Sequence, residues 1–160
     1  MKTLLSLLLL LISFNSQANI AANQINEILQ ESSAQSKPEK PHSLKVLEDY
    51  YFIYVFKSTC PHCHKFTPVI HDFVKTYQLE LHSYSIDGGT IAGLKSSPMP
   101  ADLFDTLFIN AGYKPVVPAL FLVNAQTNQV YAVLFGESTP VGLVSRLSEL
   151  LEKIKEQYDA

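Results

Sequence analysis

The chain contains two cysteines, Cys60 and Cys63, which are separated only by Pro61 and His62. A disulfide between them would close a four-residue loop. The chain-entropy model credits such a loop with about 1.9 kcal/mol of stabilisation, against about 4.7 kcal/mol for a loop of about 100 residues. Cysteines that serve only as a crosslink are more effective far apart in the sequence. The spacing therefore favours thiol chemistry over a purely structural disulfide.

The segments on either side of the pair predict where it lies in the fold. Residues 50–56 are aromatic and β-branched without a polar interruption, which predicts a strand buried on both faces. Apolar side chains then recur with helical spacing from Phe66 to Tyr77, and Pro61 suits the first turn of that helix. Cys60 is thus expected where the central strand gives way to an amphipathic helix.

This position predicts different roles for the two thiols. Unpaired N–H groups and the positive end of the helix dipole favour a thiolate at Cys60, and a protonated His62 would add a nearby cation. We therefore expect Cys60 to be the attacking cysteine. Cys63 lies one turn further along the helix, where it can attack the resulting mixed disulfide and resolve it.

The remaining pattern predicts the elements that surround this helix. A less regular strand is expected over residues 79–86, and a short helix over 101–110, which Gly112 would close. Two strands, 116–124 and 130–135, form an expected hairpin, and a last helix covers residues 140–157 with Thr139 as its N-cap. The order β-α-β-α-β-β-α predicts an α/β fold with a mixed four-stranded sheet and helices on both faces.

The N-terminal residues have the pattern of a targeting segment. Lys2 precedes an apolar run over residues 4–14, and small residues follow at Ser16 and Ala18, so residues 1–18 are expected to be a cleavable secretory signal peptide. Residues 19–43 combine a weak helical stripe with a polar, proline-containing linker. The folded domain is then expected over residues 44–160, and the protein in the periplasm.

Composition excludes several classes of protein. Hydrophobic residues make up 47% of the chain, which rules out a disordered or collagen-like protein. The formal net charge is −3 and no block of Lys or Arg occurs, so nucleic acid is not an expected partner.

A family resemblance rests on the segment Ser58-Thr59-Cys60-Pro61-His62-Cys63-His64-Lys65-Phe66-Thr67-Pro68. It resembles the active-site helix of thioredoxin-fold thiol oxidoreductases, including the kinking proline five residues after the second cysteine. Val117-Pro118 resembles the cis-proline that faces the cysteines in that fold, with Pro115 as the rival position. Over residues 44–151, the chain is most similar to the TrbB-type thiol-disulfide isomerases of pilin assembly in F-type conjugative transfer.

This resemblance implies a thioredoxin-like fold and a periplasmic thiol-disulfide oxidoreductase. Cys60 and Cys63 would be catalytic, and Pro61, His62, Val117 and Pro118 would support them. Pro118 would shape the substrate groove and keep metal ions off the cysteines. The implied partners are cysteine-containing exported proteins, among them conjugative pilus assembly proteins, and a membrane redox partner; no cofactor and no metal is implied.

The chain departs from the family pattern at Tyr54, where many members bury an acid six residues before the first cysteine. The base that would deprotonate Cys63 is therefore unassigned. Thr59 before Cys60 is similar to DsbC-like isomerases, whereas the Pro-His dipeptide resembles DsbA-like oxidases. Isomerase, oxidase and reductase directions remain open, because the direction depends on the reduction potential and the redox partner.

Three other interpretations of the cysteines compete with thiol chemistry. Residues 60–64 match the CxxCH signature of c-type haem attachment. Both cysteines could instead hold zinc or copper together with a histidine, or they could form a merely structural disulfide. The side chains available as haem axial ligands are Met99, His71 and His82, and those available to a metal are His64 and His71. Otherwise His64 is expected to be an exposed helix residue, with tuning of Cys63 as its alternative role.

Overall fold

The computed structural model describes residues 47–158, so the signal peptide and the linker expected over residues 1–18 and 19–43 lie outside the described residues. No helix within the described part is both long and apolar enough to cross a membrane. The elements in chain order are β1 (Tyr50–Phe56), α2 (Pro61–Tyr77), β2 (Leu81–Ser85), β3 (Ser97–Pro98), α3 (Ala101–Phe104), η2 (Asp105–Ile109), β4 (Ala119–Asn124), β5 (Val130–Phe135) and α4 (Pro140–Tyr158).

The strands form one mixed sheet in the order β3-β2-β1-β4-β5. β1 is central, as predicted, and runs parallel to β2 and antiparallel to β4, while β5 returns antiparallel to β4. The expectation of four strands was wrong by one: the two-residue strand β3 pairs in parallel with the end of β2. So short a pairing leaves no alternating hydrophobic pattern in the sequence.

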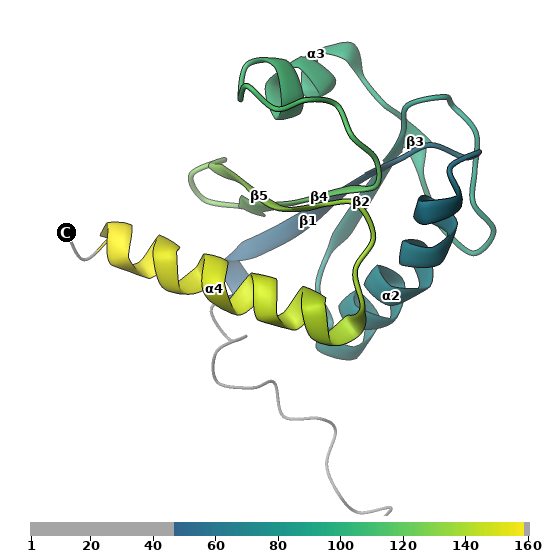
Figure 1. Cartoon of the computed structure of the whole chain (residues 1–160). Helices are drawn as coiled ribbons and strands as arrows, with labels where there is room; N and C mark the ends of the chain where they lie inside the picture. The colour runs from purple at the N-terminus through teal and green to yellow at the C-terminus, as the bar shows by residue number, and fades with distance from the viewer. Residues whose placement is uncertain (1–46, 159–160) are drawn as a thin grey trace, which may run out of the picture. The chain divides into compact units, whose positions relative to one another are not determined.

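Both faces of the sheet are covered. Successive side chains of a strand point to opposite faces, so each central strand contributes to two separate cores. One face packs against α2 and α4, and the other is covered by α3 and η2 (Figure 1). On the first face, Phe52, Tyr54 and Phe56 meet Phe66 and Ile70 of α2. On the second face the core comprises Ile53, Val55, Leu107, Phe108, Ala119, Phe121 and Val123. The uninterrupted apolar sequence of β1 follows from this two-sided burial.

Most predicted elements occur with shifted ends. The strand expected over residues 79–86 is limited to Leu81–Ser85, and the strand expected from 116 begins at Ala119, after Pro118. The helix expected over 101–110 is divided into the short helix α3 and the π-helical turn η2, and Gly112 follows it with φ +74°. The Thr139 hydroxyl accepts from the Gly142 N–H at 3.1 Å, which confirms the N-cap of α4.

Candidate active site

Cys60 lies at the junction between β1 and α2, as predicted. It is the N-cap residue of α2 in an extended conformation, and its Sγ accepts a hydrogen bond from the Cys63 main-chain N–H at 3.3 Å. The Cys60 N–H in turn donates to the Lys57 carbonyl at 3.1 Å. The Cys60 side chain is half-buried, so its sulfur combines access to solvent with a donor and the positive end of a helix.

Cys63 faces the opposite way, into the core between the sheet and α2. Its side chain is 0% exposed. Burial and the hydrogen bond with the Cys60 thiol raise the pKa of Cys63 to about 12. The Cys63 thiol is therefore held in its neutral form at neutral pH, whereas only Cys60 can be reached by a large substrate.

The carbonyl of Cys63 is held by two buried hydroxyl groups. The Thr67 hydroxyl donates to it at 2.8 Å and the Tyr54 hydroxyl at 3.2 Å, and the two hydroxyl oxygens lie 3.1 Å apart. Tyr54 is 0% exposed, and burial holds the pKa of its phenol well above the ordinary range. Tyr54, at the position where many family members bury an acid, therefore contributes a neutral hydroxyl group, which lies beside that of Thr67.

Val117 and Pro118 lie opposite the cysteines. The Val117-Pro118 peptide bond is cis, as the resemblance implied, and it is the one cis bond within residues 47–158, so Pro115 is not the cis-proline. Cys60 Sγ lies 3.8 Å from the Val117 carbonyl oxygen, at the outer limit for a thiol donor. The segment before β4 therefore forms the wall beside the exposed sulfur.

The loop before Cys60 is fixed by Asp87, which follows β2. The Asp87 carboxylate accepts from the Ser58 N–H at 3.0 and 3.1 Å, from the Ser58 hydroxyl at 2.8 Å and from the Ser85 hydroxyl at 2.7 Å. The Ser58 main-chain donor, followed by the Ser85 hydroxyl, holds the pKa of Asp87 well below its usual range. A side chain at Gly89 would collide with the Ser58 hydroxyl. We call these contacts the Ser58–Asp87 network.

Exposed charges surround the dipeptide between the cysteines. His62 Nδ1 lies 3.2 Å from a Glu137 carboxylate oxygen, and Lys65 Nζ lies 3.8 Å from the other oxygen. The His62 side chain is 62% exposed. Glu137, in the segment between β5 and α4, therefore faces the start of α2 through solvent-accessible ion pairs. Pro61 occupies the first helical position, where it needs no hydrogen-bond acceptor.

A family model described as TraF, F plasmid transfer operon protein, matches residues 17–148. The chain belongs to the TraF family. The match contains both cysteines and Pro118. The chain is also 32% identical over 108 residues to Protein TrbB of Escherichia coli (strain K12), an alignment that covers 66% of this chain and 58% of that protein. This TraF-family chain thus spans less than two thirds of the length of its curated relative.

Solved structures with similar coordinates belong to thioredoxin-type proteins. A thiol:disulfide interchange protein of the thioredoxin family from Chlorobium tepidum TLS has a TM-score of 0.47 and 17% identity, over 72% of this chain and 90% of that one. A thioredoxin-related protein from Neisseria meningitidis serogroup B has a TM-score of 0.45 and 13% identity, over 72% and 95%. The thioredoxin-like fold of the TraF-family chain itself follows from its strand order, its helices on both faces and its cysteine-bearing helix.

The histidines considered as metal or haem ligands lie in other contacts. His64 Nε2 is 2.6 Å from the Ser58 carbonyl oxygen, His71 faces Asp72 at 3.6 Å, and His82 faces Glu80 at 2.9 Å. Met99 packs beside the core on the far face of the sheet. Within residues 47–158, no three His, Cys, Asp or Glu side chains gather in a metal-binding arrangement. A thioether at Cys63 would require a buried side chain to leave the core, which argues against haem attachment.

Sequence reasoning missed three contributors to this site: Thr67, Asp87 and Glu137. Asp87 offered a signal, because it follows a strand parallel to β1, and the carboxyl ends of parallel strands share one edge of a sheet. Thr67 offered a weaker one, since it is a polar residue one turn after Cys63 on the buried side of α2. Glu137 offered none, because its contact depends on how α4 docks.

Proposed function

We propose that this TraF-family chain is a thiol-disulfide oxidoreductase in which Cys60 attacks and Cys63 resolves. The observation that carries the proposal is the contrast between an accessible sulfur capping a helix and a buried sulfur one turn behind it. A thiolate at Cys60 would receive the Cys63 N–H and the positive helix end. Pro61, His62, Val117 and Pro118 support the pair as the walls and charges around the exposed sulfur.

The reaction begins when the Cys60 thiolate attacks a substrate disulfide. A bond forms between Cys60 Sγ and one substrate sulfur, and the other substrate sulfur leaves as a thiolate. Two outcomes follow. In the first, the released substrate thiolate attacks another disulfide of the substrate, and the thiolate freed there attacks the substrate sulfur bound to Cys60. The bond to Cys60 breaks and Cys60 leaves as a thiolate, so the substrate is rearranged without net electron transfer. In the second, Cys63 loses its proton to water and attacks Cys60 Sγ, the bond between Cys60 and the substrate sulfur breaks, and that sulfur leaves as a thiolate. The substrate is then reduced by two electrons and the Cys60–Cys63 pair is oxidised to a disulfide.

The surroundings of Cys63 favour the first outcome and thus an isomerase. Within residues 47–158, the ionisable side chains that act on the Cys63 thiol are those of Cys60 and Tyr54. His62 is turned toward Glu137 and His64 toward the Ser58 carbonyl, so neither imidazole contacts the Cys63 thiol. With no carboxylate or imidazole to take its proton, Cys63 resolves slowly, and the mixed disulfide lasts long enough for the substrate to rearrange.

The partners proposed for this activity are exported, cysteine-containing proteins of a conjugative transfer system, in the periplasm. Support comes from membership of the F plasmid transfer operon family, from the similarity to Protein TrbB and from the signal peptide predicted over residues 1–18. A membrane redox partner would keep the pair reduced, because an isomerase must start each cycle with a Cys60 thiolate.

Trapping of mixed disulfides tests the assignment of the two cysteines. We expect Cys63→Ser to accumulate disulfide-linked complexes with periplasmic proteins that are absent from Cys60→Ser, as compared on non-reducing gels. The double variant is the matched control for background adducts. Equal capture by the two single variants, or capture by Cys60→Ser alone, would contradict the proposal.

The pH dependence of resolution tests the isomerase direction. A reduced chain is mixed with a glutathione-capped model peptide, and decay of the Cys60 mixed disulfide is followed after acid quench. Without an internal base the rate rises about tenfold per pH unit from about pH 7 to 9, because the fraction of Cys63 thiolate rises in that proportion. A plateau below pH 8 would reveal a base and favour a reductase or oxidase.

A further inference from the structure

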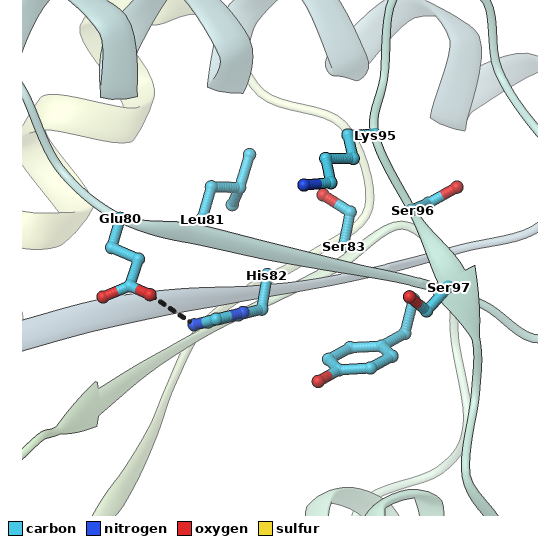
Figure 2. Close-up of a pocket in the computed structure, with 8 residues that line it drawn as sticks. Glu80, Leu81, His82, Ser83, Lys95, Ser96 and Ser97 are labelled. Carbon is cyan, nitrogen blue, oxygen red and sulfur yellow. Dashed lines mark ion pairs between the residues drawn. The ribbon is translucent and has the colours of Figure 1, made fainter.

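The outer edge of β2 is only partly covered. β3 pairs with β2 at Tyr84 and Ser85, so residues 81–83, which pair with β1 on their inner side, have no strand on their outer side in the described part of the chain. A cavity of about 280 Å³ lies along this stretch and is lined by Glu80, Leu81, His82, Ser83, Tyr84, Lys95, Ser96 and Ser97 (Figure 2). We call this cavity the β2 groove.

Main-chain groups of β2 point into the open side of the groove. The Glu80 carbonyl accepts from β1 and the Ile86 N–H donates to β1, whereas the Ser85 carbonyl accepts from Met99 on the outer side. Main-chain direction alternates along a strand in a parallel sheet. Leu81 and Ser83 therefore direct their main-chain groups outward, as Ser85 does. The parallel register Tyr84↔Ser97 places Ser97 beside the Ser83 carbonyl, because Pro98 has no N–H, so the main-chain groups open to a new strand are the N–H and carbonyl of Leu81 and the N–H of Ser83.

The side chains of the groove add a charge and an unsatisfied hydroxyl. Ser83 is only 5% exposed, and its Oγ has no hydrogen-bond partner. Figure 2 shows the Lys95 side chain on the same side of β2 as Ser83, whereas the His82–Glu80 pair lies on the other side. Lys95 forms no ion pair within residues 47–158. A buried hydroxyl without a partner is uncommon in folded proteins and calls for a ligand group.

We propose that the β2 groove binds an extended, acidic segment of a partner protein as an added strand beside Leu81–Ser83. The outward main chain of β2 would pair with the segment, and an Asp or Glu side chain would lie between Lys95 and Ser83. Glu80, the acidic residue of the lining, is paired with His82 on the other side of β2, so Lys95 is the charge that faces the segment on the Ser83 side and is expected to select acidic over basic segments.

Binding in the β2 groove would hold a partner protein close to Cys60. Asp87, which holds the loop before Cys60, lies in the turn after β2 and follows Ser83 by four residues, which places the two Cα atoms no more than about 14 Å apart. A segment held in the groove would keep the rest of its protein near Cys60. This use depends on the oxidoreductase proposed above, but the binding itself does not involve either cysteine, and the two can fail separately.

Amide NMR on the full chain tests the binding with two synthetic probes, acetyl-Thr-Val-Asp-Val-Thr-amide and the same peptide with Lys in place of Asp. We expect saturable shifts at Leu81, Ser83 and residues 95–97 with the acidic peptide. The affinity should be weak, as is typical of a small interface. Binding of the Lys peptide should be at least about fivefold weaker. A third peptide with Pro in place of the second Val should bind poorly, because it lacks a main-chain donor.

Variants separate specific binding from general charge effects. Lys95→Glu should reverse the preference between the two peptides, while Lys75→Glu, on α2 and not part of the groove lining, should leave it unchanged. Absence of saturable shifts in the groove, or equal shifts from both peptides, would overturn the proposal. So would saturation of the same amides by sodium sulfate alone, since that would identify a site for a free anion rather than for a strand.

Discussion

The two sulfurs of the motif are separated by one helical turn, yet their surroundings differ in kind. The Cys60 side is polar and accessible, with the Ser58–Asp87 network behind it, the Val117 carbonyl beside it and the His62–Glu137 pair in solvent. The Cys63 side is apolar and closed: its side chain is 0% exposed, and its carbonyl accepts from the hydroxyl groups of Tyr54 and Thr67. The comparison shows that one turn of helix separates an accessible sulfur from an enclosed one by burial rather than by residue type, and the proposed roles of attack and resolution rest on that difference.

The largest expected consequence of this contrast is a difference in thiol reactivity. With iodoacetamide at about pH 7.5, we expect the Cys63→Ser variant, which retains Cys60, to be alkylated at least about 100-fold faster than the Cys60→Ser variant. The reason is that Cys63 is both inaccessible and protonated. Rates are measured by mass spectrometry under native conditions, and both variants should react alike in urea. Similar native rates would show that Cys63 is not enclosed.

A second consequence appears in the alkaline stability of the reduced chain. The pKa of Cys63 is about 12 when folded and about 8.5 when unfolded, so the unfolded state loses this proton first as pH rises. The stabilisation is complete below about pH 8.5 and is lost up to about pH 12, with a slope of at most about 1.4 kcal/mol per pH unit. We expect urea titrations to show a shallower decline for Cys63→Ala.

Tyr54→Phe provides the matched test on the same buried side. Burial raises the pKa of the Tyr54 phenol. The part of the alkaline loss of stability that is due to Tyr54 should therefore begin near pH 10, above the onset for Cys63. At neutral pH the variant loses one hydrogen bond to the Cys63 carbonyl, and we expect a loss of about 1 kcal/mol in the free energy of unfolding. An unchanged alkaline decline would mean that Tyr54 is not enclosed in the folded state.

On the Cys60 side, Asp87→Asn is expected to have a moderate effect. An amide cannot accept from the Ser58 N–H and hydroxyl as strongly as the carboxylate does, so the loop before Cys60 loosens. We expect the reaction of Cys60 with a model disulfide to slow about 3- to 10-fold, with faster hydrogen exchange at the Ser58 amide. Asp102→Asn, on α3, is the control and should change neither.

The sequence was sufficient for the parts of this site that depend on local pattern. The cis peptide bond at Val117-Pro118 was implied by the family resemblance and not by local pattern. The apolar run of β1 and the helical spacing after Pro61 predicted the central strand and the cysteine-bearing helix. These features are set by residues close together in the chain, where periodicity and the constraint of proline act directly.

The parts that could not be predicted depend on contacts between distant segments. The Ser58–Asp87 network joins residues 29 apart, and Glu137 reaches His62 only because α4 packs near α2. β3 is a strand only because the loop after β2 returns to its edge, and two residues carry no periodic signal. Prediction of the contact between the Tyr54 and Thr67 hydroxyl groups would have required knowing which faces of β1 and α2 meet.

Glu137→Gln is expected to have the smallest effect on the reactivity of Cys60. It tests whether the polar surroundings of Cys60 include the segment before α4. The side chains of the His62–Glu137 pair are 62% and 39% exposed, so their attraction is screened by water and contributes little. Removing one negative charge near Cys60 should speed its reaction with oxidised glutathione, which is anionic, by less than about twofold. The gain should vanish when stopped-flow rates are repeated at about 1 M salt, where the screening length falls to about 3 Å. A larger, salt-independent change would mean that Glu137 holds His62 in place beside Cys60, and the polar side of the motif would then include the segment before α4.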